Sequence, residues 1–285
     1  MRQVTGPRDL PWFRHHLLEA IARQAERYSL LPAELMEPDS TPALMESASR
    51  AIAGGSLWWV SADMTRVALD ASQDLPDWTV RDAMPDTAGL LWWDGELPLM
   101  RVVDEHGSMT RTRMHAVMWS VHAGNLRMVP VVLADDGGWL MPASVGLPLE
   151  ASGLATARRG TRNWPDAYGV LCLLGATWTL MMQPQVAERR HRDQPGKDIA
   201  RARRQGWNPS PITVVDLRPM RTVSDPDAEA GSGRRLHVRH VVRGHWRQQW
   251  YPSTESHRPR WIASYLKGPE GAPIKATTPV MVWRR

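Results

Sequence analysis

Arginine and aromatic side chains alternate over a short stretch towards the carboxyl end of the sequence. Residues 234–261 hold seven arginines, three tryptophans and one tyrosine, against the single carboxylate of Glu255. Guanidinium groups pair with phosphates through two parallel hydrogen bonds, and flat rings stack on bases. This combination is typical of a surface that binds single-stranded RNA or a ribosome.

We therefore expect the binding residues to lie in this stretch and just after it. The candidates share a charged, amide or aromatic side chain. They are Arg239, Arg243, His245, Trp246, Arg247, Gln248, Gln249, Trp250, Tyr251, Arg258, Arg260, Trp261 and Lys267. The alternative interpretation is a hairpin whose rings form a core. Its arginines would then be solvated, or paired with carboxylates of the first half of the chain.

Charge is unevenly distributed along the 285 residues, whose net charge is +5. Residues 186–285 have a net charge of +11, whereas residues 1–185 have one of −6. All but three of the 35 basic residues are arginine. The net positive charge of residues 186–285 indicates an acidic partner, which can be RNA, DNA or an acidic protein face.

Three histidines, His237, His240 and His245, raise the question of a metal site. On a strand, residues 237 and 240 face opposite sides, so they do not readily share one ion. The sequence has one cysteine and no His-Glu-x-x-His motif, and it also lacks the glycine-rich phosphate-binding motifs. We expect no metal and no small-molecule cofactor.

A metal-dependent nuclease acting on RNA or DNA is the alternative function. It would use Asp216 at the end of a strand, Asp198 and Lys197 nearby, and a histidine as base. Such nucleases need at least two clustered carboxylates, and Asp216 is more simply explained as a partner of Arg218 or an adjacent arginine. We expect a protein that is not an enzyme. A further option is an interaction module whose acidic first half contacts a host protein.

The hydrophobic pattern predicts an α+β fold. It consists of a mainly antiparallel sheet with flanking helices, one central buried helix and a C-terminal β-hairpin region. Residues 1–190 are predicted to form this α+β domain, and residues 191–285 a basic, arginine- and tryptophan-rich region that packs onto it or forms a second lobe. Helices are predicted at residues 11–27 and 42–53, from Pro165 onward, and after Pro195.

Two tryptophan pairs open stretches that we interpret as strands. Residues 56–72 predict a strand, a turn and a second strand, and residues 90–104 a hairpin that turns at Asp94-Gly95. In each pair one ring faces the core, because successive strand residues point to opposite faces. The other ring packs under a helix or is exposed. Further strands are predicted up to residue 141, at 212–217, within 234–250 and at 280–285.

The apolar segments of the sequence are short. Residues 168–182 form the most apolar run, which is shorter than the roughly 20 residues of a membrane span. The amino-terminal residues contain no apolar stretch of signal-peptide length. Cys172 has apolar neighbours, which predicts a buried core residue. We expect a cytoplasmic protein without a membrane partner.

Residues 211–275 resemble a known family. This block is similar to part of small proteins encoded by phages and mobile elements of actinobacteria, and its first segment, PITVVDLRPM, also matches them. The matching residues are Gly244 to Gln249, Tyr251-Pro252, Arg258, Trp261-Ile262 and Lys267-Gly268-Pro269. The block is similar to the C-terminal region of a family of CRISPR inhibitors directed at the type V-A effector nuclease.

The resemblance implies a non-enzymatic, phage-encoded regulator that acts inside the host bacterium. Members of that family lower production of the effector nuclease by recognising its emerging chain during translation, with loss of the message. The resemblance therefore implies a partner that is a nascent polypeptide, a ribosome or RNA, and lowered production of a target protein. It assigns no individual binding residue.

Overall fold

The computed structural model describes residues 3–29, 42–103, 109–133, 139–140, 145–150, 166–218, 239–267 and 273. Contacts divide the chain into two compact units, Met1–Leu217 and Arg218–Arg285. Each unit is described by itself. The strand before residue 218 belongs to the first unit, whereas the sequence grouped residues 191–217 with the basic C-terminal region.

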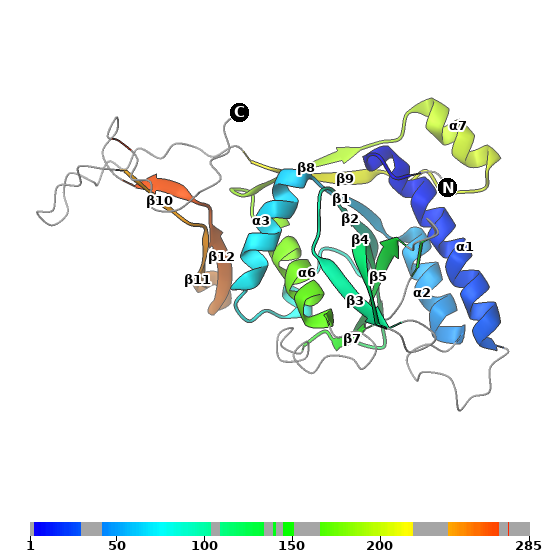
Figure 1. Cartoon of the computed structure of the whole chain (residues 1–285), viewed down its shortest axis with the longest axis horizontal. Helices are drawn as coiled ribbons and strands as arrows, with labels where there is room; N and C mark the ends of the chain where they lie inside the picture. The colour runs from blue at the N-terminus through cyan, green and yellow to red at the C-terminus, as the bar shows by residue number, and fades with distance from the viewer. Residues whose placement is uncertain are drawn as a thin grey trace, which may run out of the picture. The chain divides into compact units, whose positions relative to one another are not determined.

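A mixed sheet forms the centre of the first unit (Figure 1). Its strands run in the order β6-β5-β4-β2-β1-β9-β8, with β3 paired to β4 and β7 to β5. The bounds are β1 Ser56–Val60, β2 Ala88–Trp93, β3 Leu99–Val103, β4 Met109–His122, β5 Asn125–Leu133, β6 Trp139–Leu140, β7 Val145–Pro148, β8 Ala187–Arg192 and β9 Ile212–Leu217. In the described chain β1 pairs in parallel with β2 and β9, and the other pairs are antiparallel. The predicted α+β class with a mainly antiparallel sheet is confirmed.

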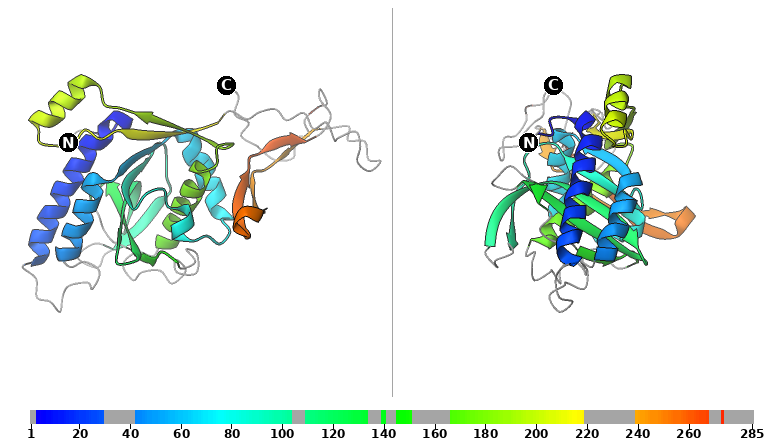
Figure 2. Two further views of the ribbon diagram at one scale, coloured as in Figure 1. Left: turned by 180° about the vertical axis from the view of Figure 1, so that it is seen from behind. Right: turned by 90° about the vertical axis from the view of Figure 1, so that its right-hand side faces the viewer.

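Helices cover both faces of this sheet, as two views show (Figures 1 and 2). The helices α1 and α2 pack on one face, and α3 and α6 on the other. The bounds are η1 Pro7–Asp9, α1 Leu10–Ser29, α2 Pro42–Gly54, α3 Ala62–Gln73, α4 Val80–Ala83, α6 Ala167–Met181 and α7 Gly196–Arg204. The helices predicted at residues 11–27, at 42–53 and after Pro195 are confirmed. So is the central buried helix, α6, in which Cys172 is buried.

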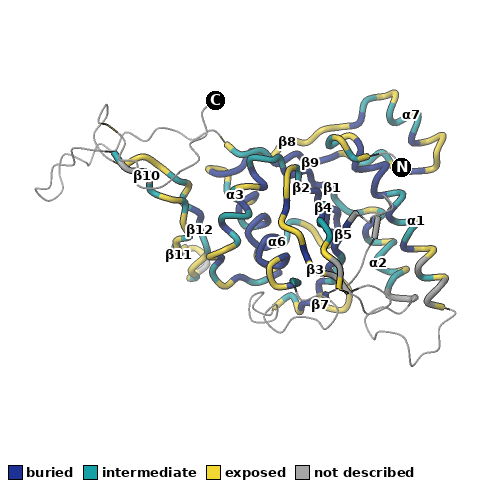
Figure 3. The backbone as a smooth tube through the Cα atoms, in the orientation of Figure 1, coloured by how far each residue is buried: buried dark blue, intermediate teal, exposed yellow. Residues whose placement is uncertain are grey.

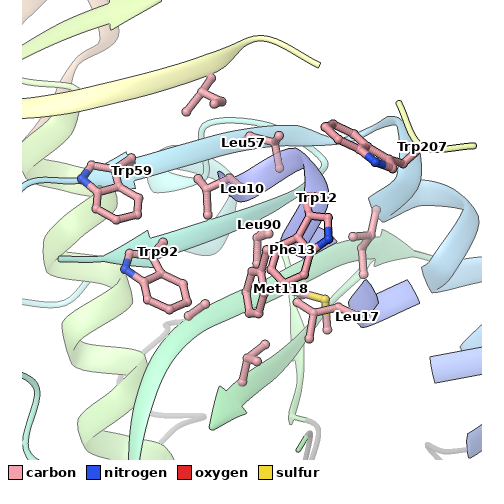
Figure 4. Packing of buried hydrophobic residues seen from close by; sticks show 14 of the residues in the cluster. Leu10, Trp12, Phe13, Leu17, Leu57, Trp59, Leu90, Trp92, Met118 and Trp207 are labelled. Atoms are coloured by element: carbon pink, nitrogen blue, oxygen red, sulfur yellow. The ribbon is translucent and has the colours of Figure 1, made fainter. Parts of the chain in front are cut away.

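The strands β1 and β2 are buried along almost their whole length (Figure 3). Trp59 and Trp92 stack with ring centroids 5.9 Å apart, and Phe13 of α1 meets Trp92 edge-on at 5.3 Å (Figure 4). On the opposite face the indole N–H of Trp93 donates to the hydroxyl of Thr177 in α6 at 3.0 Å. Because helices cover both faces, both rings of a tryptophan pair are buried, each towards its own helical layer.

The second strand predicted within residues 56–72 is wrong, because residues 62–73 form α3. Its buried residues Met64, Ala68 and Ala71 follow a spacing of three to four, which is the period of a helix. The parallel pairing of β1 with β2 also requires a crossover segment, and α3 belongs to that crossover.

The predicted hairpin at Asp94-Gly95 is also wrong. Gly95 does turn the chain, with φ of +105°, but β2 and β3 do not pair with each other in the described sheet. Both use β4, whose first half pairs with β3 and whose second half pairs with β2. The register shift between Met114 and Ala116 marks a bulge on β4 near the change of partner.

A buried arginine joins α1 to two distant segments of the first unit. Arg14 is 2% exposed, and its guanidinium donates to the Gly55 carbonyl at 2.8 Å and to the Ser210 hydroxyl at 2.7 Å. Burial lowers the pKa of Arg14 to about 10. The side chain therefore ties the first long helix to the start of β1 and to the segment before β9.

The turn between β4 and β5 offers a test of local backbone strain. Ala123 and Gly124 both have positive φ, 47° and 76°, which two-residue hairpin turns of this kind require. Replacing Ala123 with Asn is expected to stabilise the first unit by ~0.5–1 kcal/mol, because Asn tolerates the left-handed region better than Ala. Urea unfolding measures the change. Ala22→Asn, at an exposed position of α1, is the control and is expected to destabilise; a loss of stability for Ala123→Asn would contradict the prediction.

Asp166, just before α6, provides a test of pH dependence. Its carboxylate accepts hydrogen bonds from the Arg101 backbone N–H at 2.6 Å and guanidinium Nη2 at 2.6 Å. The side-chain hydrogen bond from Arg101 is the main cause that lowers the pKa of Asp166. A lowered folded-state pKa adds stability above the unfolded-state pKa, and this stability is lost as the pH falls below about 4. Asp166→Asn is therefore expected to be less stable than the parent at pH 7, with a difference that shrinks towards pH 3 in thermal unfolding. A difference that stays constant with pH would contradict this assignment.

Candidate functional site

The described residues of the second unit form two short antiparallel ladders. The strand β10, His240–Val242, pairs with β13, Tyr265–Lys267, and β11, His245–Tyr251, pairs with β12, Ser256–Ile262. The predicted C-terminal β-hairpin region is thereby confirmed. Pro252–Thr254 form a 3-10 turn between β11 and β12, and Glu255 closes it with φ of 46°.

The pairing of β11 with β12 separates the rings from most of the guanidinium groups. Cross-strand partners share a face of the hairpin, and successive residues alternate between the faces. One face, here the ring face, carries Trp246, Gln248, Trp250, His257, Pro259 and Trp261. The other, here the arginine face, carries His245, Arg247, Gln249, Tyr251, Arg258 and Arg260. The alternation in the sequence thus becomes two chemically different surfaces.

Aromatic contacts organise the ring face. Trp246 and Trp261 lie opposite each other and meet edge-on, with ring centroids 5.1 Å apart. Trp250 contacts His257 at 4.9 Å, and its side chain is 45% exposed. Trp261 is only 5% exposed, so its ring is a packing residue of the hairpin. It is therefore not exposed, although it is among the candidate surface residues predicted from the sequence. Trp250 is the ring on this face that is open to a partner.

Gly244, which precedes β11, permits the position of Trp261. A Cβ atom at residue 244 would lie 2.4 Å from Cζ2 of the Trp261 ring, well inside van der Waals contact. Only a residue without a side chain fits against the ring there. The Gly244-His245-Trp246 stretch of the sequence is therefore a packing element of the hairpin.

The arginine face carries positive charge without an opposing carboxylate in the described residues. Arg247 and Arg258 are exposed and Arg260 is half-buried, and none of the three forms an ion pair with a described carboxylate. Arg258 lies over the ring of Tyr251, 5.9 Å from its centroid. Residues 239–267 hold six basic side chains and one acidic one, and so a net charge of +5.

The remaining candidates lie on the flanks of the hairpin. The backbone N–H of Arg239 donates to the Pro273 carbonyl at 2.8 Å, and its side chain is half-buried. Arg243 and Lys267 are exposed. Arg234, Arg235 and His237 lie outside the described residues, as does the strand predicted at 280–285.

A second basic region, in the first unit, was missed as a binding candidate. The strand β8 and helix α7 lie close in the sequence, and residues 188–204 hold seven lysine and arginine residues against three acidic ones. Most of these basic residues are exposed (Figure 3). The charge count over residues 188–204 was the available signal, whereas the sequence predicts only a helix after Pro195 there.

The residues of the nuclease alternative fall into separate surroundings. Asp216 on β9 pairs with Arg190 of the neighbouring strand β8 instead of Arg218. Asp198 and Lys197 lie at the start of α7, whereas His245 belongs to the second unit. Within the described residues, no three His, Cys, Asp or Glu side chains gather so that they could hold a metal ion.

None of the described helices combines the length and the apolar character that a membrane span requires. The most apolar one, α6, has 15 residues and packs in the first unit, where most of its side chains are buried.

Comparison with known proteins gives a distant likeness in fold. The chain is similar to the crystal structure of AcrVA2, in an alignment that covers 87% of this chain and 85% of that chain. The sequence identity is 14% and the TM-score is 0.46. No family model matches the sequence, and no curated protein matches it.

Proposed function

We propose that the protein is a non-catalytic regulator of the anti-CRISPR kind, which contacts RNA through its arginine face and lowers production of a target protein. The observation that carries the RNA contact is the direct cross-strand pairing of Arg247 with Arg260. Like charges directly opposite each other on a sheet are destabilising. No described carboxylate offsets them, so an anion bound between the two side chains would relieve the repulsion.

Phosphate groups of RNA are the anions that this face fits best. Arginine forks donate parallel hydrogen bonds to phosphate oxygens, and Arg258 lies diagonally across from Tyr251 on the same face. Tyr251 is 37% exposed, so its ring is available for stacking on a base next to the charged groups. The combination supports contact with a single strand, because stacking needs bases that are not paired in a duplex.

The regulatory part of the proposal follows the resemblance of residues 211–275 to the type V-A CRISPR inhibitors. A protein that contacts RNA at the arginine face would reach a message or ribosome during translation. A nascent polypeptide would then be its next contact. The acidic balance of residues 1–185 suits a partner other than RNA for the first unit.

A pull-down from a translating lysate, with and without ribonuclease, tests the proposal. We expect RNA to be captured with the protein and to be lost after ribonuclease treatment. The affinity for RNA is expected to fall steeply between about 50 and 200 mM salt, because binding releases counterions. A protein partner that is retained after ribonuclease, from a lysate in which no RNA was captured before the treatment, would overturn the direct RNA contact in favour of a nascent polypeptide. Absence of any RNA at low salt would also overturn it.

Incubation of labelled RNA with the purified chain and Mg²⁺ or Mn²⁺ distinguishes the nuclease alternative from the proposed regulator. We expect the RNA to remain intact, because the Asp216 carboxylate forms an ion pair with Arg190. Cleavage that disappears in Asp216→Asn, with unchanged thermal unfolding, would replace the regulator by a nuclease. Cleavage that persists in Asp216→Asn would indicate a contaminating enzyme.

A further inference from the structure

A pocket of about 400 Å³ lies in the first unit, whereas the arginine face belongs to the second. Two regions that are distant in the sequence build it. Residues 5–9 and Trp12 come from the amino-terminal segment, Arg192 from the end of β8, and Lys197, Asp198 and Arg201 from α7, with Trp207 completing the wall. Its volume is within the range of pockets that hold small ligands.

Four basic side chains line this pocket: Arg8, Arg192, Lys197 and Arg201. No described carboxylate forms an ion pair with any of them. The pocket also has two carboxylates, which leaves an excess of two positive charges. This excess of positive charge makes the pocket electrostatically suited to an anion.

The two carboxylates of the pocket differ in their surroundings. Asp9 is buried and accepts hydrogen bonds from the Thr5 backbone N–H at 2.9 Å and the Thr5 hydroxyl at 3.0 Å. These bonds hold the amino-terminal segment in place, so Asp9 is a structural part of the wall. Asp198 lies in the first turn of α7 and also lines the pocket.

The remaining wall is aromatic. Trp12 is 9% exposed and Trp207 is 7% exposed, so both rings are fixed by packing and present only part of their surface. The indole N–H of Trp207 donates to Gln205 at 3.1 Å, which orients its ring. A fixed apolar wall beside a group of cations fits a ligand with one flat, weakly polar part and one strongly anionic part.

We propose that this pocket binds the phosphate monoester of a nucleotide. A phosphate monoester carries a charge of about −1.5 to −2 near neutral pH, which matches the excess of two positive charges better than the single charge of a phosphodiester or carboxylate. The flat base would lie against the tryptophan wall. A free nucleoside monophosphate and the phosphorylated 5′ end of an RNA share this chemistry. The site goes beyond the proposed function, since it lies in the other unit and does not need the arginine face.

Calorimetric titration of the full chain tests the proposal with four probes. They are adenosine 5′-monophosphate, adenosine, and a short RNA with either a 5′-phosphate or a 5′-hydroxyl. We expect the monophosphate to bind at least roughly tenfold more tightly than adenosine, because charge-assisted hydrogen bonds to phosphate supply the difference. Equal binding of the two RNAs, together with binding of the free monophosphate, assigns the pocket to free nucleotides. Preference for the phosphorylated RNA assigns it to RNA ends.

Paired variants show whether the pocket itself is responsible. Arg192→Gln with Lys197→Gln is expected to lower the affinity for the monophosphate by roughly tenfold or more, since both residues line the pocket. Both residues are exposed, so they can be replaced without loss of folding. Arg203→Gln with Arg204→Gln also removes two positive charges, both from α7 and outside the pocket, and is expected to change the affinity by less than about twofold. Asp198→Asn is expected to tighten binding.

Three results would overturn the assignment: no binding of the monophosphate, equal binding of adenosine, or equal losses in the two paired variants. Thermal unfolding of each variant verifies the fold. The arginine-face substitutions described below are expected to leave binding of the monophosphate unchanged. Failure of the pocket and failure of the RNA interface can therefore be told apart.

Discussion

Replacing Arg247, Arg258 and Arg260 together with glutamine is expected to weaken binding of single-stranded RNA by roughly a hundredfold at low salt. The three side chains lie on one face of the β11–β12 hairpin, without a described carboxylate partner. Each lost phosphate contact should lower the slope of log affinity against log salt by about 0.7, so the triple variant should lose about two units of slope. Fluorescence anisotropy with a labelled oligonucleotide measures both quantities.

A control with the same change in net charge is available in the first unit. Arg50, Arg66 and Arg81 are exposed, and each forms an ion pair with a surface carboxylate, respectively Glu46, Asp63 and Glu150. Their joint replacement by glutamine removes three charges from positions that are already paired, and such surface pairs contribute little to stability. RNA binding is expected to change by less than about threefold. If both triple variants lost affinity equally, RNA binding would depend on net charge and not on the arginine face.

Gly244→Ala is expected to unfold or rearrange the hairpin of the second unit. The added methyl group would lie 2.4 Å from the Trp261 ring, and overpacking of this kind costs about 1–3 kcal/mol. That is a large share of the stability available to a hairpin whose one buried tryptophan is Trp261 in the described residues. Hydrogen exchange of peptides from residues 244–262 measures the loss as faster exchange, and RNA binding should fall with it.

A compensating substitution distinguishes this packing effect from a general effect of alanine. Trp261→Leu, made in the Gly244→Ala background, removes the ring that the methyl group meets, and is expected to restore part of the exchange protection. Gly146→Ala in β7 has open space around its Cβ position and should behave as the parent. Hairpin protection that is unchanged in Gly244→Ala would contradict the close contact with Trp261.

Much of the helical layer can be predicted from the sequence, because the periodic spacing of apolar residues is local information. The helices α1 and α2 follow from this spacing, and α6 from its continuous apolar run. The strand predicted within residues 62–73 is wrong, because small and polar residues also fit a strand pattern. The parallel strands β1 and β2 require a crossover segment, to which α3 belongs, and this requirement is visible only in the assembled sheet.

Strand pairing was the less predictable part of the fold. The Asp94-Gly95 dipeptide is a strong local turn signal, and Gly95 does turn the chain. The partner of both flanking strands, however, is β4, a long strand that reaches both because a bulge redirects it between Met114 and Ala116. Pairing over such distances depends on which faces the helices cover, and no short window of sequence contains that information.

The candidate site shows the same division between composition and geometry. The content of arginine and tryptophan located the hairpin correctly, but it did not separate Trp261, which is buried, from Trp250, which is exposed. That difference comes from strand register and from the bare backbone at Gly244. The pocket between η1, β8 and α7 could not be predicted, because its cations come from segments almost 200 residues apart.

The place of β9 in the sheet has a consequence for how the chain matures during synthesis. This strand is the last element of the first unit along the chain, yet it lies inside the sheet between β1 and β8, and the segment before it holds Arg14 through Ser210. Until residue 217 has left the exit tunnel, one edge of β1 has no neighbour and the amino-terminal helix lacks one of its anchors. Premature termination before this point would release a product with an open, tryptophan-rich edge, which is prone to self-association.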